Sequence, residues 1–231
     1  MNRNILVVAA HPDDETLGLG GTIARHAATG DQVSVVFLTD GVDSRARNAT
    51  TALASSAERR RAAALAALAE LGAIPHAFGT FPDNALDTVP LLEIVRFVEA
   101  AKDALRPKVI YTHHAGDLNI DHRLTAQAVW TAFRPQPNES WESIYAFEVA
   151  SSTEWGGNGI SGPFVPDTFI DIAPWWPRKA AALRCYEEEM RHAPHARSHG
   201  SVEALARWRG ANAGFAYAEA LLTHRRRLQA H

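Results

Sequence analysis

Residues 4–21 read N-I-L-V-V-A-A-H-P-D-D-E-T-L-G-L-G-G. The apolar run at 5–10 ends at a histidine and a proline, which predicts a strand buried on both faces of a parallel sheet. Three consecutive acids, residues 13–15, then follow at the carboxyl end of this strand, where open α/β sheets bind ligands. Three carboxylates beside the His11 imidazole favour a bound divalent cation. An acidic turn that caps the next helix would have the same composition.

A second group of histidines and aspartates strengthens the metal interpretation. Residues 111–123, Y-T-H-H-A-G-D-L-N-I-D-H-R, follow another short apolar run, so both groups can meet at one sheet edge. His11 and Asp14 are three residues apart across a turn that opens a helix, and both can face one ion. His122 is the expected third ligand, although alone it would more simply be an exposed residue at a helix start. Asp13 is then placed to act as general base, and Asp121 to orient a neighbouring imidazole or acid.

The rest of the chain alternates between strand and helix patterns, which predicts a right-handed parallel α/β core in a single domain, residues 1–231. No stretch has the composition of a linker. The three arginines at 59–61 are most simply a solvated helix face. Further strands are expected at 32–38, 76–81, 109–112, 143–150 and 167–172, and helices at 22–29, 57–71, 90–105, 122–133, 176–190 and from 202 onward.

Composition limits the class of protein. With 231 residues and 46% hydrophobic content, the chain can fill one core. The net charge of −3 gives no reason to expect a nucleic-acid partner. Cys185 is the only cysteine, which fits a reducing cytoplasm, and no apolar run is long enough for a signal peptide core or a membrane span. We therefore expect a cytoplasmic protein, which could be a homo-oligomer.

The motifs A-H-P-D-D-E, after the first strand, and D-H-R, about a hundred residues later, resemble those of the PIG-L/LmbE-like family of zinc-dependent de-N-acetylases. The resemblance extends over most of the chain. It implies a Rossmann-like fold, a mostly parallel sheet with helices on both faces. It also implies zinc-dependent hydrolysis of an N-acetyl group from an amino sugar or a related metabolite. Carried over residue by residue, His11, Asp14 and His122 match the metal ligands, and Asp13 matches the general base.

The second motif departs from the family pattern. Many members have H-P-D-H, whereas this chain has N-I-D-H, so that Asn119 replaces a histidine thought to stabilise the oxyanion or protonate the leaving amine. Asparagine can donate a hydrogen bond to an oxyanion but cannot deliver a proton. The acid would then be His113, His114 or His195, or Asp13 would carry the proton both ways.

Substrate recognition is assigned to polar residues near the other strand ends. Arg45, Asp83 and Asn84 are candidate substrate-binding residues, and the segment 151–155 offers hydroxyl groups and an aromatic platform. Arg45, Arg123 or Arg197 could hold a phosphate, so the expected small N-acylated amino sugar could also be nucleotide- or lipid-linked.

Three alternatives stay open at this point. Another divalent ion could replace zinc. The scissile group could be N-formyl or the amide of a thiol conjugate. A protein of this fold could also bind a sugar or nucleotide without catalysis.

Overall fold

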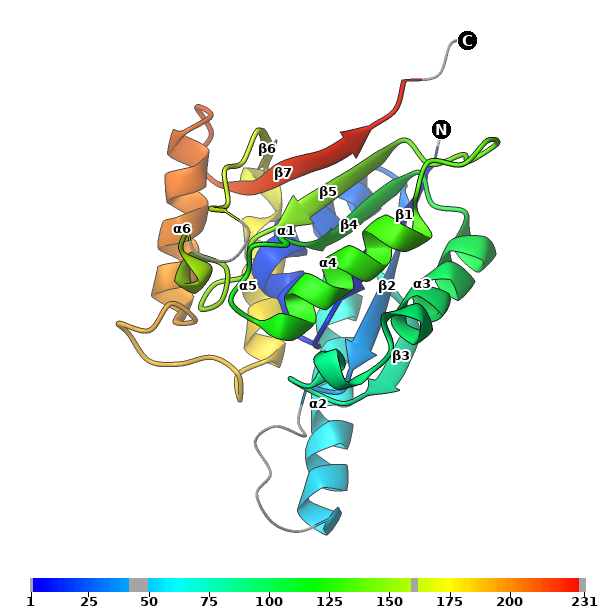
Figure 1. Cartoon of the computed structure of the whole chain (residues 1–231). Coiled ribbons are helices and arrows are strands. Elements are labelled where there is room, and N and C mark those ends of the chain that lie inside the picture. Colours follow the sequence, from blue (N-terminus) through cyan, green and yellow to red (C-terminus); the bar gives the residue numbers. More distant parts are fainter. Residues whose placement is uncertain (1, 42–49, 159–161, 229–231) are drawn as a thin grey trace.

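The computed structural model describes residues 2–41, 50–158 and 162–228. Its described strands form one seven-stranded sheet in the order β3-β2-β1-β4-β5-β7-β6 (Figure 1). The strands are β1 (Asn4–Ala9), β2 (Gln32–Thr39), β3 (Ile74–Phe81), β4 (Val109–His113), β5 (Ser143–Phe147), β6 (Thr168–Asp171) and β7 (Ala218–Arg226). The helices are α1 (Asp14–Ala28), α2 (Thr50–Leu71), α3 (Leu91–Leu105), α4 (Ile120–Ala132), α5 (Trp176–Cys185) and α6 (His199–Ala211).

Strands β1 to β5 are parallel, which confirms the predicted α/β class and the mostly parallel sheet. From β1 the chain proceeds outward to β2 and β3, then returns to the other side of β1 with β4 and β5. The order of the strands therefore reverses between β1 and β4. In an open α/β sheet the crevice at such a point is where ligands bind. The two motifs follow these two strands.

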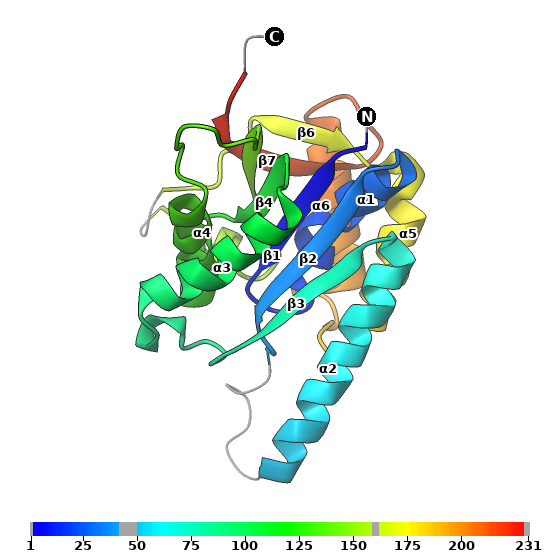
Figure 2. The same cartoon turned by 90° about the vertical axis from the view of Figure 1, so that its right-hand side faces the viewer.

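The alternation of side chains along β1 divides the hydrophobic core into two layers. Ile5 and Val7 face one layer, in which β1 packs against α1, and α1 packs against α2 and α5. Leu6 and Val8 face the other layer, which α3 and α4 cover. Figure 2 shows these two groups of helices on opposite faces of the sheet. A strand buried on both faces must be apolar at every position, which explains the unbroken apolar run.

The first helix begins earlier than predicted. We expected a helix at 22–29 and a turn at 11–14 that opens a helix; α1 starts at Asp14 and continues through Gly18, Gly20 and Gly21 to Ala28. A Cβ at Gly18 would lie 2.8 Å from the carbonyl oxygen of Glu148, and one at Gly21 would lie 2.6 Å from Ile172. These glycines are therefore required for close packing of the helix, and not for a turn.

Strand β7 was not predicted. It pairs antiparallel with β5 on one side and β6 on the other, so the sheet is mixed at this edge. Its sequence, A-E-A-L-L-T-H-R-R, is rich in residues that favour helices, and pairing with two strands overrides that local preference. In the part of the chain that the structure describes, no helix has the length and apolar character needed to cross a membrane.

Candidate metal centre

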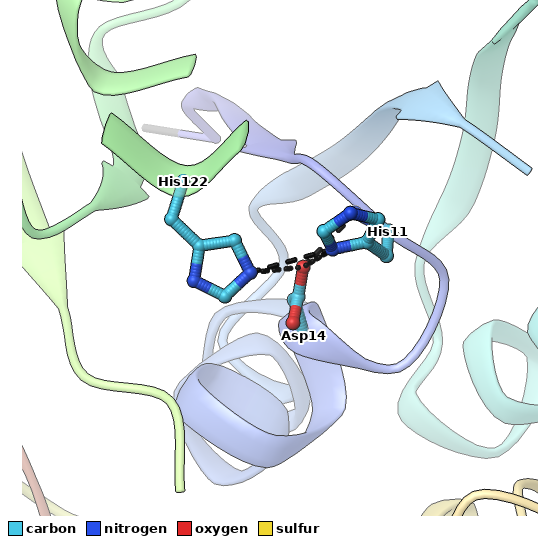
Figure 3. Close-up of side chains that lie close together, drawn as sticks. All are labelled: His11, Asp14 and His122. Atoms are coloured by element: carbon cyan, nitrogen blue, oxygen red, sulfur yellow. Dashed lines mark hydrogen bonds and ion pairs between the residues drawn. The ribbon is translucent and has the colours of Figure 1, made fainter. Parts of the chain in front are cut away.

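His11, Asp14 and His122 lie together at the carboxyl ends of β1 and β4 (Figure 3). His11 is in the turn after β1, Asp14 begins α1, and His122 is in the first turn of α4. The Asp14 Oδ2 atom is 3.1 Å from His11 Nδ1 and 3.2 Å from His122 Nε2. The two imidazole nitrogens are 3.3 Å apart. Three donor atoms from buried side chains thus converge on one point, and the adjacent strands β1 and β4 bring them there.

Each of these histidines has its other ring nitrogen beside carboxylates. His11 Nε2 is 3.1 Å from Asp121 Oδ2 and 3.2 Å from Asp83 Oδ1. His122 Nδ1 is 3.1 Å from Asp117 Oδ2. A ring N–H that donates to a carboxylate fixes the tautomer, so the lone pair of the opposite nitrogen faces the cluster. Both imidazoles are therefore oriented as metal ligands usually are.

Asp117 is a residue of the candidate site that sequence analysis did not single out. Its carboxylate accepts hydrogen bonds from the Thr153 hydroxyl, at 2.6 Å, from the Ser152 hydroxyl, and from the Asn119 backbone N–H, at 2.8 Å. Burial alone would raise the pKa of Asp117, but His122 and the two hydroxyl groups lower it below its ordinary range overall. The available signal was its position in the H-A-G-D-L-N-I-D-H motif, five residues before His122.

Asp13, the predicted general base, lies beside the candidate metal ligands in a strained conformation. Its φ of 122° is rare for a residue other than glycine, which fits the clustering of backbone strain at functional sites. The Glu15 carboxylate stabilises this turn by accepting from the Asp13 backbone N–H at 3.0 Å. Burial raises the pKa of Glu15 to about 7.

Two arginines hold one oxygen of the Asp13 side chain. Arg197 Nη1 is 2.8 Å and Arg60 Nη1 is 3.4 Å from Asp13 Oδ2. The other oxygen, Oδ1, is buried and has no hydrogen-bond partner among the described residues. Burial and the neighbouring Asp14 raise the pKa of Asp13, while Arg197 and Arg60 oppose that shift. Oδ1 is therefore the atom of Asp13 that is available to take a proton.

The interpretation of Arg60 as part of a solvated face was wrong. Arg60 is 6% exposed, and it donates to the carbonyl oxygen of Pro12 at 2.8 Å and forms an ion pair with Glu189. A run of three arginines gave no indication that the middle one points inward. Sequence analysis considered Arg197 only for phosphate binding. In the structure Arg197 lies in a loop 184 residues after Asp13 and contacts the Asp13 carboxylate.

The donor set fits a divalent cation on grounds of charge as well as geometry. Among the described residues, six buried acids lie in or around the cluster, and two arginines, Arg60 and Arg197, contact one of them; the acids are Asp13, Asp14, Glu15, Asp83, Asp117 and Asp121. The Asp14 Oδ1 atom is also buried without a partner among the described residues. Uncompensated buried carboxylates are costly, and a cation held by two imidazoles and a carboxylate would compensate them.

The other predicted residues form the surroundings of His11. Asp121 accepts from the backbone N–H groups of Asn84, at 2.7 Å, and Leu86, at 3.0 Å, in addition to its contact with His11. Asn119 caps α4 by accepting from the Asp121 N–H, and its amide donates to Asn84 Oδ1. Asp83 is 5% exposed and contacts His11. The structure thus brings Asp83, Asn84, Asn119 and Asp121 together, whereas Arg45 lies outside the described residues.

The three histidines considered as general acids have different environments. His113 Nε2 accepts from the Ala10 backbone N–H at 2.8 Å, and burial lowers the pKa of His113 well below its ordinary value. His114 Nε2 is 3.3 Å from the carbonyl oxygen of Gly162. His195 Nδ1 accepts from the Arg197 backbone N–H at 3.0 Å. His113 is thus held neutral in the wall of the site.

Comparison with known proteins identifies the family. The family described as GlcNAc-PI de-N-acetylase (PIG-L) matches residues 6–133. The chain belongs to this family. Membership confirms the predicted family and an enzymatic function.

Individual relatives cover most of the chain. It is 30% identical over 239 aligned residues to a 1D-myo-inositol 2-acetamido-2-deoxy-alpha-D-glucopyranoside deacetylase of Mycolicibacterium vanbaalenii, over 84% of this chain and 83% of the relative. It is 32% identical over 203 residues to a 4-oxalmesaconate hydratase of Pseudomonas putida, over 79% of this chain and 72% of the relative. Its fold matches that of N,N'-diacetylchitobiose deacetylase from Pyrococcus horikoshii, with a TM-score of 0.78 at 19% identity over 96% and 83% of the two chains.

Proposed function

We propose that this chain is a zinc-dependent hydrolase that removes the N-acetyl group from a small amino sugar. The observation that carries the proposal is the convergence of His11 Nδ1, His122 Nε2 and Asp14 Oδ2 on one point, with Asp13 adjacent. Two imidazole nitrogens and a carboxylate oxygen are a donor set that suits zinc. The deacetylase relative supports the amino-sugar substrate.

His11, Asp14 and His122 would hold the ion, which when bound polarises an acyl carbonyl and lowers the pKa of water toward neutrality. Asp13 acts at Oδ1, where it takes the proton from the attacking water. Arg197 and Arg60 fix the other oxygen, so the carboxylate keeps one orientation through the reaction. The products are acetate and the free amine.

Asp13 is also proposed to return the proton to the leaving nitrogen. Asn119 has no acidic proton, and its amide and carbonyl groups already bond Asn84 and the Asp121 N–H. His113 uses Nε2 as an acceptor and is held neutral. The raised pKa of Asp13 suits a group that must first accept a proton and then release it.

The test combines a substrate panel with one variant. N-acetyl and N-formyl amino sugars, including the substrate named for the deacetylase relative, are incubated with the zinc-loaded protein while acetate and formate release are measured. Asp13→Asn should retain zinc and lose turnover by at least about a hundredfold, as expected for a general base. Asp103→Asn, an exposed site on α3, serves as the matched control and should retain full activity. If Asp13→Asn keeps its turnover, the assignment of the base is wrong.

A hydratase is the second candidate, because the Pseudomonas putida relative is 32% identical over 203 residues. The test is direct: 4-oxalmesaconate is added to the zinc-loaded protein, and its hydration is followed by absorbance. Hydration without acetate release from any N-acetyl sugar would favour this second function. Bound metal with neither activity would instead favour a sugar-binding or nucleotide-binding protein.

A further inference from the structure

A cavity of about 560 Å³ lies at the edge of the sheet opposite the metal centre. Its wall includes Arg3, which precedes β1, Tyr111 of β4, Tyr145 of β5 and Arg226 at the end of β7. The start of β1 and the end of β7 lie at the same end of the molecule in Figures 1 and 2. Strand β4 separates the two sites: Val109 lines the cavity and His113 adjoins the metal ligands. At about 3.3 Å per residue, Val109 is about 13 Å along the strand from His113, and Tyr111, which also lines the cavity, is about 7 Å from it.

Arginine dominates the charge of this cavity. Arg3, Arg25, Arg226 and Arg227 line it, and among the described lining residues Glu142 is the one acid. Arg3 is paired with Asp31 at 2.7 Å, and Arg227 donates to backbone carbonyl oxygens of 139 and 141.

Two of these arginines have no acidic partner. In the described ranges, neither the Arg25 nor the Arg226 guanidinium has a hydrogen bond or ion pair, and that of Arg25 lies 6.0 Å from the centre of the Trp175 ring. Glu142 has its own cation, Lys108, at 3.5 Å. Within the described part of the chain, the cavity therefore has guanidinium groups that no carboxylate compensates.

A buried relay of polar side chains supports one wall of the cavity. Asp31 Oδ2 is 2.7 Å from His26 Nδ1, and His26 Nε2 is 2.8 Å from the Tyr111 hydroxyl. His26 and Tyr111 are 4% and 3% exposed, and burial lowers the pKa of His26, which is therefore neutral. Neutral His26 donates to Asp31 and accepts from Tyr111, so the Tyr111 oxygen keeps its acceptor capacity. The relay has no contact with the metal centre, and the proposed reaction does not use it.

Beside the relay, the cavity offers the face of an aromatic ring. Tyr145 stacks on Tyr111 with ring centroids 5.7 Å apart and an interplanar angle of 24°. Tyr145 is half-buried, so part of its ring can contact a bound molecule. Arginines with no acidic partner next to an aromatic surface match a ligand that combines an anionic group with a flat ring.

We propose that this cavity binds a small ring compound that carries a phosphate or carboxylate group. Arg25 and Arg226 bind the anionic group, and the ring packs on Tyr145. The site is separate from the metal centre, and the proposal does not depend on which acyl group the enzyme removes.

The experiment is calorimetric titration of the full-length, zinc-loaded protein with phenyl phosphate, benzoate, inorganic phosphate and benzyl alcohol. Phenyl phosphate or benzoate should bind, and inorganic phosphate and benzyl alcohol should bind at least tenfold more weakly, because each lacks one of the two features. The double variant Arg25→Gln/Arg226→Gln should weaken the bound probe at least tenfold, about 1.4 kcal/mol. The double variant Arg96→Gln/Arg207→Gln, at two exposed positions elsewhere, is the matched control and should bind as the unaltered protein does.

If the double variant folds poorly, the single variant Arg226→Gln, at an exposed position, replaces it, and it should likewise weaken binding of the probe. Equal affinity of the Arg25→Gln/Arg226→Gln variant and the unaltered protein would place the probe elsewhere and overturn the proposal. Absence of binding by both ring probes would also overturn it. Equal affinity for inorganic phosphate and phenyl phosphate would eliminate the role of the ring.

Discussion

Replacing Asp117 by asparagine should weaken zinc binding although Asp117 is not itself a predicted ligand. The Asp117 carboxylate faces four donors: the His122 ring, two hydroxyl groups and one backbone N–H. Asparagine has one acceptor oxygen, and its NH₂ group must face some of those donors. The His122 ring then loses the charged partner that fixes its tautomer, so its lone pair is less well directed toward the ion.

The expected magnitude follows from the role of such partners. Loss of a carboxylate that orients a histidine ligand weakens metal affinity about 10- to 100-fold, which is about 1.4–2.7 kcal/mol. Zinc affinity is measured by competition with a chelating dye, on protein that circular dichroism shows to be folded. The free energy of unfolding of the metal-free protein is measured separately, since the lost hydrogen bonds also affect stability.

A second variant separates orientation of the histidine from general loss of stability. Thr153→Val removes the hydroxyl group that donates to Asp117 Oδ2 and leaves the contact between Asp117 and His122 in place. It should lower the free energy of unfolding but reduce zinc affinity much less than Asp117→Asn does. If Asp117→Asn binds zinc within twofold of the unaltered protein, Asp117 does not orient His122 and the reasoning is refuted.

Three further predictions concern metal, pH and packing. Removal of metal by a chelator should lower the thermal midpoint, and zinc should restore it, because a ligand at a thousandfold excess over its Kd stabilises by about 4 kcal/mol; an unchanged midpoint would contradict a metal centre. Asp31→Asn should lower the free energy of unfolding at pH 7 by about 1.5–3 kcal/mol. Burial alone would raise the pKa of Asp31, but hydrogen bonds from Arg3 and His26 lower it overall. The stabilisation by the Asp31 carboxylate is therefore complete above its unfolded-state pKa of about 3.9 and is lost as the pH falls below that value. Denaturation experiments should thus show a smaller difference in unfolding free energy between the unaltered protein and Asp31→Asn at pH 3 than at pH 7. Gly18→Ala should destabilise by about 1–3 kcal/mol, since its Cβ would lie 2.8 Å from the Glu148 carbonyl oxygen, and a neutral effect in denaturant titrations would contradict that packing.

The sequence was sufficient to predict the strands and motifs that bring the proposed ligands together. Runs such as residues 5–10 are apolar at every position, and this pattern is typical of central parallel strands. The polar residues that follow them must then lie at one edge of the sheet. The adjacency of β1 and β4, which brings His122 to His11, could be anticipated because the two motifs complement each other chemically.

The residues that support the site could not be predicted in the same way. Asp117 and Asp121 both look like candidates in one short motif, and only the fold determines that the first contacts His122 and the second His11. Arg60 has the same local pattern as its neighbours at 59 and 61. Its burial depends on how α2 packs near the turn that contains Asp13, and no local periodicity encodes that orientation.

Contacts with distant residues explain why the sequence pattern predicted a helix only from residue 22, whereas α1 starts at Asp14. In a regular helix the Gly21 N–H would donate to the Leu17 carbonyl oxygen. Here the Gly21 N–H donates to Glu219 at 2.9 Å, and Leu17 O accepts from Lys179 Nζ at 2.8 Å. The buried Lys179–Glu219 ion pair, at 2.6 Å, thus bonds backbone groups about one and two turns after Asp14. Its two members come from α5 and β7, more than 150 residues away, so a glycine-rich stretch that resembles a loop in isolation becomes a helix in the folded chain. The orientation of Asp14 toward the histidines therefore depends on the part of the chain that local patterns describe least well.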